Sequence, residues 1–418
     1  MAAEAKQSPG LTTPGYLAPF IIVTALFFIF GFVTTLNMAL VPHLRAVFRL
    51  NYAWAMLAET AFFLAYFVFS APAAKLIDWI GYKQTMVAAL FIQVIGCLLF
   101  IPAAKFISLA LFLSAIFIVG AGITALQTAA NPYVAILGPE HSAPVRLTLA
   151  QAFNSIGALL APLIGGALIL AASPGAESQA ALAATVRMPY LVIAGALLLL
   201  GIGVALSHLP HIEHAQESHL STEAGALHSR SIWSFRHTVL GALGIFFYVG
   251  VEVGLASIAV NYFKSQGMSS LKTASYLVSL YWGGAMVGRL LGSWMLTKIQ
   301  TGRLVSIFAA SGAVLLAVSM FTSGPVAIWT LVLCGFFNSI QFPNVFALGI
   351  AGLGPLTSRG SGLINTAIVG GAVIPYLIGA LADKIGIQGS FVLPVACYLY
   401  IAWYGMWGSK PVKTAISY

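Results

Sequence analysis

The chain consists of long apolar runs separated by short polar stretches. An apolar stretch of about 20 residues crosses the hydrocarbon core of a bilayer as an α-helix. Twelve such runs start near Tyr16, Ala53, Tyr82, Ser108, Arg146, Pro189, Thr238, Thr273, Leu304, Val326, Gly360 and Phe391. Strands of a membrane barrel would alternate in polarity over about ten residues, and these runs do not. The pattern therefore predicts an all-α membrane protein with twelve transmembrane helices.

One long polar interruption, roughly Ser207–Arg236, separates the sixth run from the seventh. Two short segments repeat across it. Pro162 and Pro375 open similar heptapeptides 213 residues apart, and the Gly-Pro pairs that begin at Gly138 and Gly354 are 216 residues apart. Both offsets are close to half the chain, and a parallel repeat of two six-helix halves describes the major facilitator fold. We therefore expect an N-terminal half at 1–206, a cytoplasmic linker at 207–236 and a C-terminal half at 237–418.

The interruption also contains five of the eight histidines and three glutamates. They are His208, His211, His214, His219, His228, Glu213, Glu217 and Glu223. A metal site is one interpretation, but the spacing matches no ordered metal motif. We prefer a solvated linker and predict neither a metal nor another cofactor.

Charge and composition fit a membrane protein. Hydrophobic residues make up 60% of the chain and charged residues 7%, against about 25% charged in a soluble domain. The net charge of +9 is scattered, so nucleic acid is not an expected partner. With both termini cytoplasmic, twelve Lys and Arg residues lie inside and seven outside, in agreement with the positive-inside rule. We expect a lipid-embedded monomer in the inner membrane, with both termini cytoplasmic and no cleavable signal peptide.

Nine amide side chains lie in the first, fourth, fifth, tenth and eleventh apolar runs. A buried amide needs a partner, which in a helix bundle is another helix, the backbone or a hydroxyl-rich ligand. One amide alone is more often a tie between helices, whereas nine of them indicate a polar central cavity. They are Asn37, Gln127, Asn131, Gln151, Asn154, Asn338, Gln341, Asn344 and Asn365.

Aromatic side chains accompany these amides, among them Phe153, Trp282 and Phe337. Sugar hydroxyls use amide donors and acceptors, and the apolar face of the ring packs on aromatic carbon. A charged substrate would need a fixed countercharge, and we expect no lysine or arginine in the middle of a span. The sequence therefore predicts a neutral sugar bound by Asn37, Gln127, Asn131, Gln151, Asn154, Trp282, Asn338, Gln341 and Asn365.

Two acidic residues, Glu252 and Glu59, stand inside apolar runs, whereas the other eight fall in loops, tails or helix ends. An intramembrane acid is a functional-site hypothesis by default. Glu252 lies deep in run seven, where it can be protonated, hydrogen-bonded, bound to a cation or bound to a sugar hydroxyl. Glu59 is closer to the outer end of run two. We predict Glu252 as the coupling acid and Glu59 as the second candidate.

The loop between runs two and three carries Lys75, Asp78 and Lys83. It resembles the loop signature of facilitators, in which an acid and basic residues latch helices together in the outward-open state. Arg289, followed by Lys298 and Arg303, occupies the corresponding place in the second half without an acid. We predict Asp78, Lys83 and Arg289 as a cytoplasmic gate, with ordinary juxtamembrane charge as the alternative.

Several segments along nearly the whole chain are distinctive. The most specific is Arg146-Leu147-x-Leu149-Ala150-Gln151-x-Phe153-Asn154, and the others are Phe27–Phe32, Leu36-Asn37, Pro42-His43-Leu44, Thr128–Tyr133, Leu137–Glu140 and Ser339–Pro343. These segments resemble the fucose–galactose–glucose:proton symporter family. The resemblance implies an inner-membrane sugar symporter with the two-half facilitator fold.

The chain departs from that family at two positions. In its fucose-transporting members, helices one and four carry an Asp and a Glu that have been assigned to proton and sugar handling. This chain has Met38 and Gln127 there. Glutamine also occurs in hexose-transporting relatives, whereas Met38 removes the expected carboxylate. Either Glu252 or Glu59 carries the coupling ion, which is a proton or sodium, or the carrier is a uniporter.

The sequence thus predicts a secondary active transporter that imports a neutral hexose or N-acetylhexosamine by alternating access. Glucose and galactose are the first candidates. N-acetylglucosamine joins them because Met38 offers apolar surface to an acetamido methyl group. No enzyme is expected, because the chain has no phosphate loop or nucleophile elbow with partners. A drug exporter of the same fold and a non-transporting sugar sensor are the alternatives.

Overall fold

The structure is a computed structural model and describes residues 11–12, 15–38, 40–50, 57–170, 178–210, 231–267 and 271–411. Within helices, the side chains of residues 37–38, 41–42, 45–46, 162–170 and 271–275 lie outside this description. Every regular element of the described residues is helical, as the apolar runs predict.

The first half of the chain contains α1 (Leu17–Met38), α2 (Leu40–Phe48), α4 (Leu57–Phe106), α5 (Leu109–Ile136), η1 (Glu140–Ser142), α6 (Ala143–Leu170), α7 (Gln179–Ala184) and α8 (Arg187–Leu206). The second half contains η2 (Ile232–Ser234), α10 (Arg236–Ser265), α11 (Leu271–Met295), α12 (Thr301–Phe321), α13 (Gly324–Asn338), α14 (Gln341–Ile350), η3 (Gly354–Leu356), α15 (Thr357–Thr366), η4 (Ala367–Val369), α16 (Gly370–Ser390), α17 (Val392–Trp403) and η5 (Tyr404–Gly408).

Two glycines turn the chain between antiparallel helices. Gly81 divides α4 into two arms with φ 78° and ψ 170°. Gly386 divides α16 in the same way, with φ 79° and ψ 163°. L side chains rarely adopt a positive φ of this size, whereas glycine does so without steric penalty. Each glycine lets one helix end and the next begin almost without a loop.

The crossings agree with the predicted architecture. Eight helical stretches of the described residues are long and apolar enough to cross a membrane. α4 is one of them and crosses twice. α6, α11 and the segment after Gly386 supply the remaining three crossings. The prediction of twelve transmembrane helices is confirmed.

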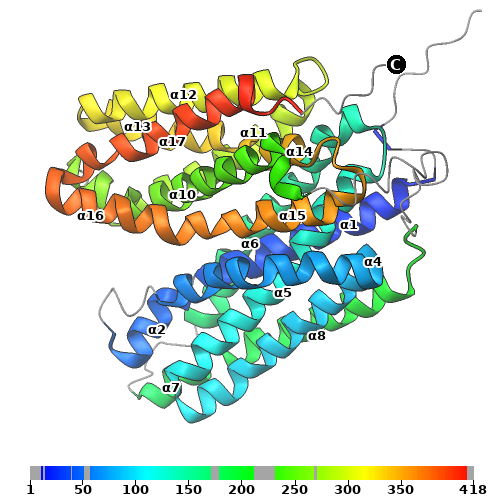
Figure 1. The fold of residues 1–418 in the computed structure, drawn as a ribbon. Helices are drawn as coiled ribbons and strands as arrows, with labels where there is room; N and C mark the ends of the chain where they lie inside the picture. Colours follow the sequence, from blue (N-terminus) through cyan, green and yellow to red (C-terminus); the bar gives the residue numbers. More distant parts are fainter. Residues whose placement is uncertain are drawn as a thin grey trace, which may run out of the picture.

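The helices form two groups, α1 to α8 and α10 to η5 (Figure 1). The groups meet through α4, α5 and α6 on one side and α11, α14 and α15 on the other. α8 ends at Leu206 and α10 begins at Arg236. The domain boundaries stay predictions, because residues 211–230, with most of the histidines and glutamates of the linker, lie outside the described residues.

Candidate functional site

An acid and a base lie side by side in the interior of the second half. Glu252 of α10 and Arg289 of α11 form an ion pair with 3.9 Å between Oε1 and Nη2, and their side chains are 14% and 9% exposed. The Tyr248 hydroxyl, one helical turn before Glu252, donates to the same carboxylate oxygen at 2.6 Å. Charge pairing is the usual condition for keeping an ionisable group in a membrane-spanning bundle. Glu252 is therefore held by one cation and one hydroxyl.

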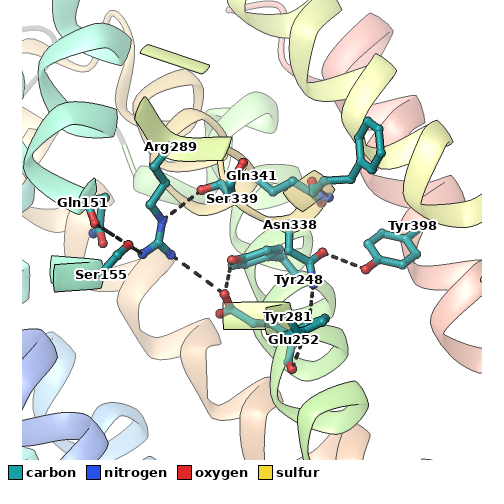
Figure 2. Close-up of polar contacts among 11 residues, drawn as sticks. Gln151, Ser155, Tyr248, Glu252, Tyr281, Arg289, Asn338, Ser339, Gln341 and Tyr398 are labelled. Atoms are coloured by element: carbon teal, nitrogen blue, oxygen red, sulfur yellow. Dashed lines mark hydrogen bonds and ion pairs between the residues drawn. The ribbon is translucent and has the colours of Figure 1, made fainter. Parts of the chain in front are cut away.

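The Arg289 guanidinium also reaches the other half of the molecule (Figure 2). Its Nη1 donates to the Gln151 carbonyl at 3.3 Å and to the Ser155 hydroxyl, both on α6. Its Nε donates to the Ser339 carbonyl at 3.1 Å. The expectation that no lysine or arginine lies in the middle of a span is wrong for Arg289, which pairs with Glu252 deep in the bundle. Glu252 and three oxygen acceptors together compensate for the burial of the charge.

Glycine spacing explains how Arg289 comes to lie there. Gly284, Gly288 and Gly292 recur every four residues on one face of α11, and a Cβ on each would lie within 3.1 Å of the segment Phe336–Ile340. Residues four apart share a helix face, and small residues let two helix backbones approach closely. α11 therefore packs tightly on α13 and directs Arg289 toward the interior. In the sequence, Arg289 groups with Lys298 and Arg303, which follow α11 in the chain, and nothing there indicates this contact.

Asn338 is a tie within the second half in this conformation. Its amide nitrogen donates to the Tyr281 hydroxyl at 2.6 Å, and its amide oxygen accepts from the Tyr398 hydroxyl at 2.7 Å. Tyr281 in turn donates to the backbone carbonyl of Glu252 at 3.4 Å. The network joins α10, α11, α13 and α17 behind the ion pair. The predicted role of Asn338 as a sugar contact stays a prediction.

A small, partly open recess lies between α1 and α5. Its lining consists of Leu26, Phe27, Phe30, Leu126, Gln127, Ala130 and Asn131. Both amide atoms of Asn131 and the amide oxygen of Gln127 are buried and have no hydrogen-bond partner. Leaving a buried polar atom unpaired costs about 1–3 kcal/mol, so a ligand that reached these atoms when the helices part would gain their hydrogen bonds. Two of the predicted sugar contacts therefore share one recess with aromatic carbon.

The other predicted amides line the interior nearby. Gln151 is 3% exposed and has an unpartnered amide nitrogen, and Gln341 is fully buried with an unpartnered amide oxygen. Figure 2 shows these two amides together with Arg289. Asn154 donates to the Phe27 carbonyl at 3.3 Å, which ties α6 to α1. Trp282 is 36% exposed and packs edge-on against Tyr281.

Polar contacts between the two halves gather at one end of the molecule. Asp78, in the last turn of the first arm of α4, accepts from the Ser358 hydroxyl and pairs with Arg359 at 3.7 Å. The carboxylate thus faces the first turn of α15, where the helix dipole favours negative charge. Figure 1 shows α4 and α15 side by side here. Asp78 therefore bridges the halves, as its predicted gate role requires.

Three further contacts join the halves near this end. The Asn365 amide donates to the Thr128 hydroxyl at 3.0 Å, and the Ser361 hydroxyl donates to the Thr128 carbonyl at 2.8 Å. The Asn344 amide donates to the Thr148 hydroxyl at 3.3 Å. Asn365 is thus a contact between α15 and α5 in this conformation. We call the contacts of Asp78, Thr128 and Thr148 with the second half the latch.

The remaining predicted residues lie elsewhere. Lys83 donates to the Ala205 and Ser207 carbonyls, each at 2.8 Å, at the end of α8 in its own half. Glu59 is in the first turn of α4, at the opposite end of that helix arm from Asp78. The side chains of Asn37 and Met38 lie outside the described residues. The roles that the sequence predicts for Lys83, Glu59 and Asn37 therefore stay predictions.

Arg146 is a buried residue whose structural role the sequence did not predict. Its fully buried guanidinium donates to the carbonyls of Val134, Ala135, Gly138 and Pro139, to the Leu11 carbonyl and to the Ser142 hydroxyl. The last carbonyls of a helix have no partner within it. Arg146 supplies that partner at the end of α5. Its only signal in the sequence was its place in the segment Arg146–Asn154.

Comparison with known proteins identifies the family. The protein-family model described as Major Facilitator Superfamily matches residues 22–374 of this chain. The chain belongs to the major facilitator superfamily. Among solved structures of this superfamily, the transporter FucP in its outward conformation matches with a TM-score of 0.83 and 31% identity. The match covers 94% of this chain and 99% of that chain.

Curated relatives are similar to this facilitator over nearly its whole length. A glucose/galactose transporter of Brucella abortus is 46% identical over 390 residues, 93% of each chain. The L-fucose-proton symporter of Escherichia coli is 32% identical over 407 residues, 92% of each chain. The predicted resemblance to the fucose–galactose–glucose:proton symporter family is confirmed. The expectation that this facilitator is not an enzyme is confirmed by the same relatives.

Proposed function

We propose that this facilitator is a secondary active transporter that imports a neutral sugar, with glucose and galactose as the first candidates. The observation that carries the proposal is the recess between α1 and α5, where Gln127 and Asn131 offer unpartnered amide atoms beside Phe27 and Phe30. An amide provides donors and acceptors together, which matches a polyol. The apolar face of a sugar ring packs on aromatic carbon such as that of Phe27 and Phe30.

The names of the relatives support a sugar as the substrate class. The Brucella relative is a glucose/galactose transporter, and the Escherichia coli relative is an L-fucose-proton symporter. N-acetylglucosamine stays in the set because Met38 replaces a carboxylate of the fucose-transporting members and so offers apolar surface.

Glu252 is our candidate for the coupling acid. It is a largely buried carboxylate with one cationic partner and one hydroxyl donor. A proton that binds there changes the charge of a buried pair, and transport can respond to that change. An uncoupled uniporter is the second candidate, because Met38 and Gln127 stand where fucose-transporting members carry acids. Sodium is the alternative coupling ion.

We infer that the structure corresponds to the outward-open state. The latch lies at the end that carries Asp78, which the distribution of Lys and Arg assigns to the cytoplasm. The similarity to FucP in its outward conformation supports this assignment. We place the protein in the inner membrane as a lipid-embedded monomer with both termini cytoplasmic.

Uptake into proteoliposomes tests the proposed function. Glucose, galactose, fucose and N-acetylglucosamine are offered separately under an imposed proton gradient, an imposed sodium gradient or no gradient. We expect uphill accumulation of glucose or galactose under the proton gradient. Uptake that only equilibrates would support the uniporter, and accumulation under the sodium gradient alone would change the ion. The absence of uptake and of exchange with all four sugars would contradict the proposal.

A further inference from the structure

The Arg289 guanidinium divides its hydrogen bonds between the two halves of the molecule. Nη1 binds the Gln151 carbonyl and the Ser155 hydroxyl of α6, whereas Nε binds the Ser339 carbonyl of its own half. Only Nη2 faces Glu252, at 3.9 Å, which exceeds the usual 2.7–2.9 Å of a charge-assisted hydrogen bond. The hydrogen bonds of Arg289 therefore go to the other acceptors, and Glu252 interacts with the guanidinium only at the longer distance.

We propose that Arg289 is a positioning residue that makes the proton affinity of Glu252 depend on contact between α6 and α11. The inference rests on the proposed function of a proton-coupled sugar transporter. It adds that the cation beside the acid is shared with the opposite half, so the movement of the halves changes the acid.

Alternating access separates α6 from α11, because the two helices belong to different halves that meet at the closed end. When they separate, Arg289 loses the Gln151 carbonyl and the Ser155 hydroxyl. A buried guanidinium needs acceptors for its five N–H groups, and the charged acceptor within reach is Glu252. The ion pair then shortens to hydrogen-bond distance. A closer cation stabilises the carboxylate over the carboxylic acid.

The direction of this effect suits import. While α6 and α11 are in contact, the outside is open in our assignment, the cation is shared and Glu252 binds a proton more readily. After they separate, the inside is open. Arg289 keeps the Ser339 carbonyl of its own half and turns its remaining N–H groups toward Glu252, and the proton leaves inward. When α6 returns, Ser155 and Gln151 again accept hydrogen bonds from Arg289. Arg289 thus favours proton binding to Glu252 while the outside is open and proton release from Glu252 while the inside is open.

Few titratable groups face Glu252 from the helices around it. Tyr248 donates to the carboxylate from its own helix, and Tyr281 of α11 donates to the backbone carbonyl of Glu252. Tyr398 of α17 lies behind them, bound to Asn338. Among these groups, Arg289 is the one that carries a charge and changes partners between the halves.

Removing the Ser155 hydroxyl tests the proposal with the intact protein in proteoliposomes. The titration of Glu252 is followed by the infrared C=O stretch of its protonated carboxyl group, assigned as the band absent from Glu252→Gln. In Ser155→Ala, Arg289 has one acceptor fewer on α6 and turns toward Glu252. We expect the titration midpoint to fall by roughly one pH unit, a tenfold loss of proton affinity. The external pH for half-maximal sugar uptake should fall with it.

Two variants separate coupling from structure. Ser155→Thr keeps a hydroxyl on α6 and should restore the midpoint of the unchanged protein. Thr148→Val removes another hydrogen bond between the halves, that with Asn344, without touching Arg289, and should leave the midpoint in place. A Ser155→Ala midpoint equal to or above that of the unchanged protein, or an equal fall in Thr148→Val, would overturn the proposal. The infrared titration needs no sugar, so failure of the sugar assignment remains a separate result.

Discussion

Gln127 and Asn131 are one helical turn apart on α5 and line the same recess. Their positions in an apolar run were enough to predict buried amides. The run could not show which amides keep free atoms, because the partners come from other helices. Tyr281 and Tyr398 satisfy Asn338, whereas no described residue satisfies Asn131. At this scale the sequence predicts the polar group, and only the packing separates a tie from a binding group.

Replacement of Asn131 tests the recess directly. A hydrogen bond between neutral groups contributes about 1 kcal/mol, so Asn131→Ala should weaken sugar affinity about fivefold. The affinity is measured by isothermal titration calorimetry with the sugar that is transported. Gln93→Met is the matched control, because Gln93 is a buried amide on α4 that does not line the recess. Equal affinities for Asn131→Ala and the unchanged protein would remove this side chain from the site.

At the scale of the elements, the Asp-x-x-Gly turn occurs twice with nearly the same backbone geometry. Asp78 precedes Gly81 and Asp383 precedes Gly386, each by three residues. Asp78 meets the first turn of α15, whereas Asp383 is exposed. The sequence predicted a gate at Asp78 from its basic neighbours. It could not predict that Ser358 and Arg359 are the partners or that Lys83 binds α8, since both facts depend on packing between helices far apart in the chain.

Asp78→Asn should weaken the latch. The change removes a charge that faces a helix N-terminus and a cation, a contribution of about 1–2 kcal/mol. We expect the population with α4 and α15 apart to rise roughly tenfold. Electron–electron double resonance between spin labels at Trp79→Cys and Arg303→Cys measures that population, and the native cysteines are buried. Asp383→Asn, in the matching turn, should leave the distances unchanged; an equal effect of both variants would contradict the latch.

At the scale of the whole molecule, the two halves were predictable because the repeats at Pro162 and Pro375 gave offsets near half the chain. The conformational state was not predictable, because it depends on which ends of the halves touch. Arg289 belongs to this scale as well. Its closeness in sequence to Lys298 and Arg303 suggested a position at a loop. In the structure Arg289 lies between α10 and α6, because the glycine face of α11 packs on α13. Arg289 thus takes part both in contacts between the halves and in the ion pair with Glu252, the proposed coupling acid.

The most direct test of the account is Glu252→Gln in proteoliposomes. Glutamine keeps the size of the side chain and can accept from Tyr248, but it cannot take up and release a proton. We predict that sugar counterflow continues while accumulation driven by a proton gradient is lost, and Glu59→Gln measured in parallel decides between the two acids. Accumulation by Glu252→Gln at the level of the unchanged protein would contradict the claim that Glu252 couples transport to the proton.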